Sequence, residues 1–93
     1  MNTYELTIVL PEDKDGKDKA RVLKVVTDFV KKAKGEINKQ ESWGAKHLAY
    51  PIRKLEVGDY EHLVLSLPSA EQPMLDKVLR LDEAILRYMF IRV

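Results

Sequence analysis

Apolar residues recur at two different spacings along the chain, and each change of spacing marks a new element. The first segment, residues 3–10, is apolar at alternate positions: Tyr4, Leu6, Ile8 and Leu10. This alternation is typical of a strand with one buried face. Pro11 has no N–H to donate to a neighbouring strand, so we expect the strand to end there. The polar residues 12–17 then predict a loop.

The spacing changes to three and four residues from about Asp18. One apolar stripe follows, formed by Val22, Leu23, Val26, Phe29, Val30 and Ala33. This pattern predicts an amphipathic helix of about 17 residues. Gly35 comes directly after the stripe, where a left-handed residue commonly ends a helix, so we expect it to be the C-cap.

A long extended segment, Glu36 to Ile52, changes the phase of its alternation along its length. Ile37, Trp43 and Ala45 share one parity, whereas Leu48, Tyr50 and Ile52 share the other. Because a shift of one residue exchanges the two faces of a strand, the segment needs one extra residue between these sets. Glycine tolerates the torsions of a β-bulge, so we expect the bulge at Gly44.

The remaining chain predicts a third strand, a second helix and a last strand. Turn residues at 57–59 lead to a strand at 60–67 that buries Leu63, Leu65 and Leu67. Ser69 and Gln72 have the spacing of a capping box, although Pro73 would shift the start of the helix. Its buried stripe would comprise Leu75, Val78, Leu79 and Leu81. Asp82 and Glu83 mark its exit, and the apolar residues 84–93 form the last strand.

This order of elements predicts an α+β fold of the ferredoxin-like, split βαβ type (βαββαβ). Right-handed crossovers give a four-stranded antiparallel sheet in the order 4-1-3-2, with two helices on one face. Residues 1–93 suffice for a single such domain. We expect the helices to cover Met89 and Ile91. The open face would then show Thr7, Val9, His62, Val64, Leu86, Tyr88 and Phe90.

Aromatic residues on an open four-stranded sheet are how RNA-recognition motifs stack unpaired bases. Those motifs concentrate their aromatic residues in a glycine-rich third strand, and residues 60–67 contain no such run. We therefore favour an open face that another protein, or a second copy, covers. Tyr88 and Phe90, together with Trp43, are assigned to a partner-protein interface.

Composition narrows the class of protein. Apolar residues make up 45% and charged residues 33% of the chain, which suits a soluble globular fold. The absence of cysteine excludes disulfides, thiolate zinc sites and cysteine nucleophiles, and favours the cytoplasm. Met1 leads directly into a strand-like segment, and no apolar run is long enough to span a bilayer. We therefore expect neither export nor a membrane partner.

Residues that could carry out catalysis are scattered. His47 and His62 lie on separate predicted strands, without other ligands at metal spacing, and the four glycines form no phosphate loop. Acylphosphatases share this fold class, but they need an arginine-bearing loop after the first strand, where this chain has an acidic one. We expect no catalytic residue, metal, cofactor or small-molecule substrate.

Charge alone leaves nucleic-acid binding open. The net charge is only +1, and the basic run from Arg21 to Lys34 is typical of a solvated helix face. A smaller basic group follows at Lys46, Arg53 and Lys54.

The segment from Trp43 to Lys54 reads Trp-Gly-Ala-Lys-His-Leu-Ala-Tyr-Pro-Ile-Arg-Lys. It resembles, nearly position for position, the signature of the bacterial small-subunit ribosomal protein six family. Tyr4-Glu5 and the passage from Leu81 to Met89 are also similar to that family, so the resemblance covers essentially the whole chain. It implies the same split βαβ fold.

The resemblance also implies a structural role in the ribosome, in the cytoplasm. Such proteins pair with small-subunit ribosomal protein eighteen and bind the central domain of the small-subunit (16S) ribosomal RNA. The RNA-binding candidates that follow are Lys46, Tyr50, Arg53, Lys54, Arg80, Arg87 and Arg92. For each basic residue, the alternative to an RNA contact is a solvated surface position. For Trp43, Leu48 and Ile52, packing within the protein is favoured over an RNA contact.

Two positions depart from the family pattern. Asn2-Thr3 stand where an arginine is common, so the residues give less reason to expect an N-terminal phosphate contact. The sequence ends at Val93 without the polar tail of many members.

We expect the exposed second strand to dock the partner, because an edge strand presents unpaired donors and acceptors. The alternative function is a ferredoxin-like regulatory domain that self-associates through its open face without binding RNA.

Overall fold

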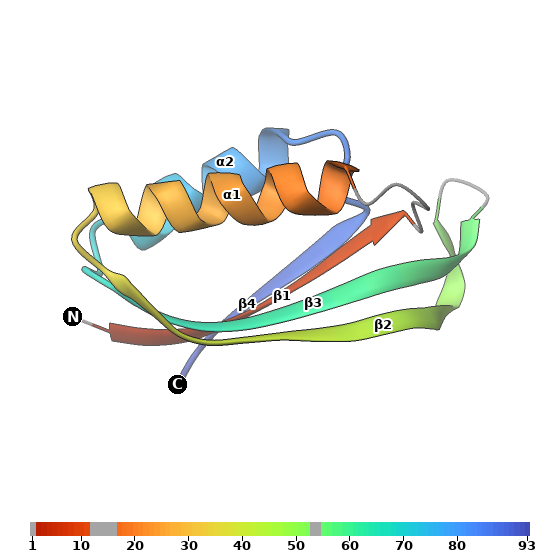
Figure 1. The fold of residues 1–93 in the computed structure, drawn as a ribbon, viewed down its shortest axis with the longest axis horizontal. Helices are drawn as coiled ribbons and strands as arrows, with labels where there is room; N and C mark the ends of the chain where they lie inside the picture. The colour runs from red at the N-terminus through yellow and green to blue at the C-terminus, as the bar shows by residue number, and fades with distance from the viewer. Residues whose placement is uncertain (1, 12–16, 53–54) are drawn as a thin grey trace.

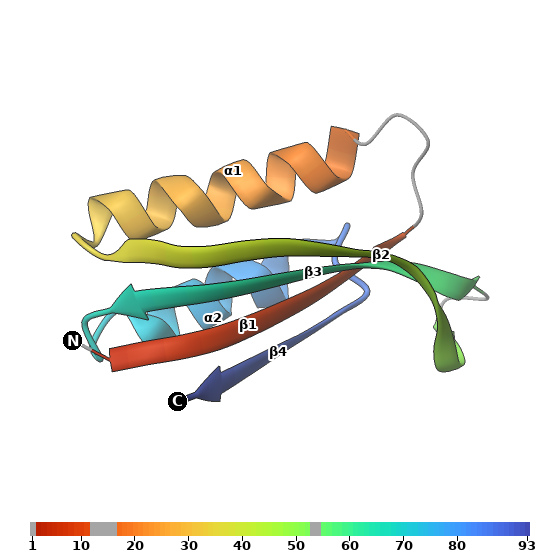
Figure 2. The same ribbon diagram turned by 60° about the horizontal axis from the view of Figure 1, so that its bottom comes forward.

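In the computed structural model, which describes residues 2–11, 17–52 and 55–93, two helices lie on one face of a four-stranded sheet (Figure 1). The elements are β1 (Asn2–Pro11), α1 (Lys17–Lys32), β2 (Glu36–Ile52), β3 (Leu55–Leu67), α2 (Gln72–Leu81) and β4 (Arg87–Arg92). The strand order is β2-β3-β1-β4 and every neighbouring pair is antiparallel. The predicted fold class and strand order are confirmed. Figure 2 shows β2 and β4 as the two edges.

The core lies between the sheet and the helices. The alternating residues of β1 pack against their counterparts on β3, as predicted, and both sets are buried. α1 contributes the buried side chains Val22, Val26 and Val30, and α2 contributes Leu75 and Leu79. Apolar burial on this one face is the main stabilising contribution to the fold.

The end of α1 differs from the prediction. Lys34, not Gly35, has the positive φ of 62°. The Lys34 N–H donates to Lys31 O at 3.1 Å and the Gly35 N–H to Val30 O at 2.9 Å, which is a Schellman pattern. Gly35 is required for a different reason, because a Cβ there would collide with the carbonyl oxygen of Ser66 on β3.

β2 extends over the predicted range and has the predicted irregularity at Gly44. Its register with β3 shifts between Ser42 and Gly44, and Gly44 has a φ of 75°. A further shift between Ile37 and Lys39 was not predicted. This second shift adds one more residue to β2. For this reason Ile37 packs against the core, whereas Trp43, which has the same parity, lies on the opposite face.

The turn predicted at 57–59 is wrong, because those residues lie inside β3. Gly58 pairs with Pro11 on one side and with Lys46 on the other. A Cβ at Gly58 would lie 2.6 Å from Val9 Cγ1, so this glycine permits close packing between strands rather than a turn.

The second helix begins at Gln72, and the predicted capping box is absent. Glu71 is the N-cap without a side-chain hydrogen bond, and Pro73 lies in the first turn. Proline is compatible only with a helix start, which leaves Ser69 outside the helix. Leu81, predicted in the buried stripe, is 70% exposed.

The last strand has the opposite facing to the prediction. Phe90 pairs with Leu6 and Tyr88 with Ile8, both of which point toward the helices. Side chains of directly paired residues share a face, so Tyr88 and Phe90 lie on the helix side. Met89, which pairs with Thr7, lies on the open side with Ile91 and Arg87.

An ion pair joins α1 to the loop before β4. Arg21 donates from Nη1 to Asp82 Oδ2 at 3.0 Å and from Nη2 to Asp82 Oδ1 at 2.9 Å. Asp82 Oδ1 also accepts from the backbone N–H of Ala84 at 3.0 Å. The guanidinium of Arg21, and then the Ala84 N–H, hold the pKa of Asp82 below its ordinary value of 3.8.

The Arg21–Asp82 pair predicts a pH-dependent contribution to stability. Because the pKa of Asp82 is lower in the folded state, its contribution is present above about pH 3.8 and is lost as pH falls through the folded pKa. We expect Asp82→Asn to cost about 1 kcal/mol at neutral pH, since Arg21 is half exposed. Urea unfolding of both proteins from pH 7 to pH 2.5 measures the difference, and a difference that grows toward low pH would contradict the assignment.

Candidate nucleic-acid interface

The face of the sheet opposite the helices carries transverse rows of side chains. The strand pairing aligns Arg87, Val9 and Tyr60 in the first row, Met89, Thr7 and His62 in the second, and Ile91, Glu5 and Val64 in the third. β2 adds Lys46, Trp43, Glu41 and Lys39 along one edge of this open face. The face is therefore basic and aromatic toward β2 and apolar toward the end of β4.

Trp43 stacks on His62 at a ring-centroid distance of 4.6 Å and an interplanar angle of 11°. The bulge at Gly44 lets Trp43 lie over β3, and the Trp43 side chain remains 42% exposed. Hydrogen bonds fix both rings: His62 Nδ1 lies 3.0 Å from Thr7 Oγ1, and Trp43 Nε1 donates to Glu41 Oε2 at 3.1 Å. The stack is thus held in place before any ligand binds.

Glu41, the carboxylate beside the stack, already forms an ion pair. Lys39 Nζ lies 2.8 Å from Glu41 Oε1. Lys39, and then the indole N–H of Trp43, lower the pKa of Glu41, while Glu41 raises the pKa of Lys39. Glu41 therefore stays ionised and its charge is balanced by a neighbouring cation.

Lys46 completes the arrangement. Its ammonium lies 5.1 Å from the centroid of the Trp43 ring and 6.0 Å from that of Tyr60, within the range of a cation–π contact. Trp43, His62, Lys46 and Tyr60 are called the stacking cluster below. Among the predicted residues only Trp43 and Lys46 belong to it. His62 was expected on the open face, but neither His62 nor Tyr60 was predicted as a binding residue, because their proximity to Trp43 depends on the bulge.

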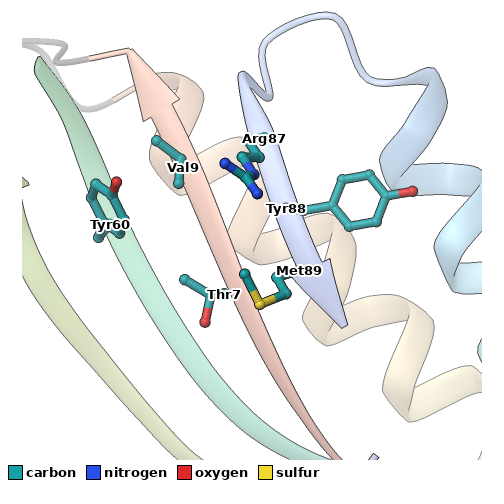
Figure 3. A pocket seen from close by; sticks show the side chains of 6 residues that line it. All are labelled: Thr7, Val9, Tyr60, Arg87, Tyr88 and Met89. Atoms are coloured by element: carbon teal, nitrogen blue, oxygen red, sulfur yellow. The ribbon is translucent and has the colours of Figure 1, made fainter. Parts of the chain in front are cut away.

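A shallow pocket adjoins the stacking cluster across β1 and β4 (Figure 3). It is lined by Thr7, Val9, Tyr60, Arg87, Tyr88 and Met89. Figure 3 shows that the ring of Tyr88 extends to the other side of β4 from the side chains of Arg87 and Met89. Arg87 is exposed and lies on the same face as Lys46, on β4 at the opposite edge of the sheet from β2.

The other predicted RNA contacts are dispersed. Arg80 lies on α2, on the helix side, where its Nη2 is 2.6 Å from Asp76 Oδ2 and where Tyr88 and then Asp76 raise its pKa. Arg92 pairs with Tyr4 near the end of β4 and donates to Asn2 Oδ1 at 3.3 Å. Arg53, Lys54 and the side chain of Tyr50 lie outside the part of the chain that the structure describes.

The predicted placement of Tyr88 and Phe90 on the open face is wrong. The Tyr88 hydroxyl donates to Asp76 Oδ1 of α2 at 3.0 Å, and Phe90 meets Tyr4 edge to face at 5.5 Å. Residues 84–93 are apolar at nearly every position, so their alternation did not reveal which side faces the helices. Of the residues assigned to a partner interface, only Trp43 lies on the open face.

Within residues 2–11, 17–52 and 55–93, no group of three potential ligands is positioned to hold a metal ion. Neither described helix is long and apolar enough to cross a membrane.

Fold and surface together define a class: a split βαβ domain whose open sheet face is aromatic and basic toward β2. A family model described as Ribosomal protein S6 matches residues 3–92. The chain belongs to the ribosomal protein S6 family, and the resemblance found in its sequence is confirmed. This is a family of structural ribosomal proteins, not of enzymes.

Relatives of known name are similar in sequence to this chain along nearly its whole length. The small ribosomal subunit protein bS6 of Corynebacterium efficiens is 39% identical over 93 residues, covering 100% of this chain and 98% of the relative. The protein of the same name from Geobacter metallireducens is 34% identical over 91 residues, covering 97% of this chain and 76% of the relative. The crystal structure of the 30S ribosomal protein S6 from Thermotoga maritima has a TM-score of 0.88 at 22% identity, covering 99% of this chain and 87% of that one. This last likeness bears on the fold alone.

Proposed function

We propose that this chain is a structural component of the small ribosomal subunit and binds its 16S ribosomal RNA together with small-subunit ribosomal protein eighteen, in the cytoplasm. The family match over residues 3–92 carries this proposal. The family's relatives are named as proteins of the small subunit, and the part of the chain that the structure describes holds no metal-ligand cluster.

The distribution of charge supports binding with a partner. The net charge is only +1, so the chain alone neutralises few phosphates. Arg87 ends the first row of the open face on β4, and Lys46 lies near Tyr60 at the other end of that row. Tyr50, Arg53 and Lys54 follow Lys46 in the sequence, near the β2–β3 connection. A basic partner would supply the remaining phosphate contacts. We assign it to the outer edge of β2, whose backbone donors and acceptors face no further strand in the described part of the chain.

RNA binding with and without protein eighteen tests the proposal. With a central-domain RNA fragment at two or more salt concentrations, we expect weak binding by the chain alone and roughly tenfold or greater tightening by the partner. Lys46→Met should reduce the slope of log K against log salt by about 1. Lys24→Met, on the exposed face of α1, is the control of equal charge and should leave the slope unchanged.

Two results would oppose this function. Tight, sequence-specific binding by the isolated chain would remove the need for a partner. A salt-stable homodimer that binds no RNA, with or without protein eighteen, would instead support the self-associating regulatory domain.

A further inference from the structure

We propose that the stacking cluster binds one unpaired nucleotide of RNA, whose base stacks on Trp43 and whose phosphate contacts Lys46. The inference rests on the proposed function and assigns an RNA contact that lies on the open face rather than at the β2–β3 connection. Its basis is the stacked pair of Trp43 and His62 with Lys46 above Trp43 and Tyr60.

The rings are positioned to receive a base. His62 covers one face of the indole, and the hydrogen bonds from Trp43 to Glu41 and between His62 and Thr7 hold the two rings parallel. Among the residues that the structure describes, the cation over Trp43 is the long, flexible side chain of Lys46. Base stacking on an aromatic ring is stronger than an exposed cation–π contact, so a base would displace the ammonium. The released ammonium remains within reach of the phosphate of the same nucleotide.

Charge on this part of the face favours RNA over a protein occupant. Lys39 and Lys46 lie beside the rings, and the carboxylate in contact with the stack, Glu41, is neutralised by Lys39. Apart from Trp43 itself, the exposed apolar side chains Met89 and Ile91 of the open face lie on β4, at the far side of the sheet. A protein partner that covered the exposed apolar side chains would have to extend across the sheet to Met89 and Ile91, whereas an aromatic platform flanked by cations matches a single nucleotide.

The test uses the indole N–H of Trp43, the sole tryptophan of the chain, as an NMR probe. The chain is labelled with ¹⁵N, and protein eighteen and RNA are left unlabelled, so that one indole signal reports on the stacking cluster. We expect a small change on adding protein eighteen and a large one on adding a central-domain RNA fragment. A single-stranded oligonucleotide should shift the signal more than a duplex of equal length, because paired bases cannot stack on the indole.

Matched variants of Trp43 measure how much the stacked base contributes to the affinity for RNA. With protein eighteen present, Trp43→Leu should weaken binding of the RNA fragment roughly tenfold, the range expected for one stacked base, whereas Trp43→Phe should keep most of the affinity. Lys24→Met is the control on the helix side and should bind as the unaltered chain does. Urea unfolding confirms that each variant is folded.

Three outcomes overturn the inference. If protein eighteen alone shifts the indole signal fully and RNA adds nothing, the stacking cluster is a protein interface. If Trp43→Leu binds RNA as tightly as the unaltered chain, the cluster makes no stacking contact, while the proposed function still stands. If the unaltered chain binds no RNA even with protein eighteen, the proposed function fails and the inference fails with it.

Discussion

Replacing Lys19 with methionine is expected to lower the free energy of unfolding by about 2–3 kcal/mol. Lys19 Nζ lies 2.7 Å from Glu61 Oε1 and 3.7 Å from Asp59 Oδ2, and it donates to Ser42 Oγ at 3.1 Å. Glu61 is 1% exposed on the helix side of β3. Removing the lysine leaves a buried carboxylate without its cation, beside a second carboxylate. The expected loss lies below the range of about 3–5 kcal/mol for fully buried pairs, because the Lys19 side chain is 31% exposed.

A double-mutant cycle isolates this pair from other effects. Lys19→Met with Glu61→Leu should recover most of the loss, since no unpaired charge is then buried. Lys24→Met removes an equal charge from the exposed face of α1 and should change stability by less than about 0.5 kcal/mol. Additive losses in the double variant would show that Lys19 and Glu61 do not interact.

The same pair gives a pH signature at alkaline pH. Glu61, the largest cause, and Asp59 raise the pKa of Lys19 above its ordinary 10.5. The folded state therefore gains stability from the charged lysine below about pH 10.5 and loses it as pH rises through the folded pKa. The stability difference between the unaltered chain and Lys19→Met should narrow over that range in urea unfolding.

Much of the fold was predictable because the strongest patterns are local. The alternation of β1 and the apolar stripe of α1 each follow from one buried face, and right-handed crossovers then leave few topologies. The strand order followed from the order of the six elements together with these crossovers. Gly44 was predicted as a bulge because the change of phase along β2 requires one extra residue.

What could not be predicted depends on contacts between elements. β4 carries apolar residues on both faces, so its facing is decided by packing against β1 and α2 rather than by its own pattern. Gly58 resembles a turn residue but is needed for close approach to Val9. The stacking cluster joins Trp43 on β2 to His62 and Tyr60 on β3, and only the register between the two strands brings them together.

Gly35 and Gly44 permit a comparison of two different requirements for glycine. We expect Gly35→Ala to lower the free energy of unfolding by about 3 kcal/mol, because the added methyl group would collide with the backbone oxygen of Ser66. It would also lie 3.0 Å from Leu67 Cδ2 and 3.2 Å from Val30 Cγ1, so neither β3 nor α1 can move aside cheaply. Urea unfolding with a check of the m-value measures the loss.

Gly44→Ala is the matched control, because its methyl group would meet no atom within 4 Å and its only requirement is a φ of 75°. A residue with a side chain in the left-handed region costs about 1–2 kcal/mol, less than the collision at Gly35. Asparagine visits that region more readily, so Gly44→Asn should cost less than Gly44→Ala, whereas Gly35→Asn should cost at least as much as Gly35→Ala. The reverse ranking at either position would mean that the torsional and steric requirements have been assigned to the wrong glycines.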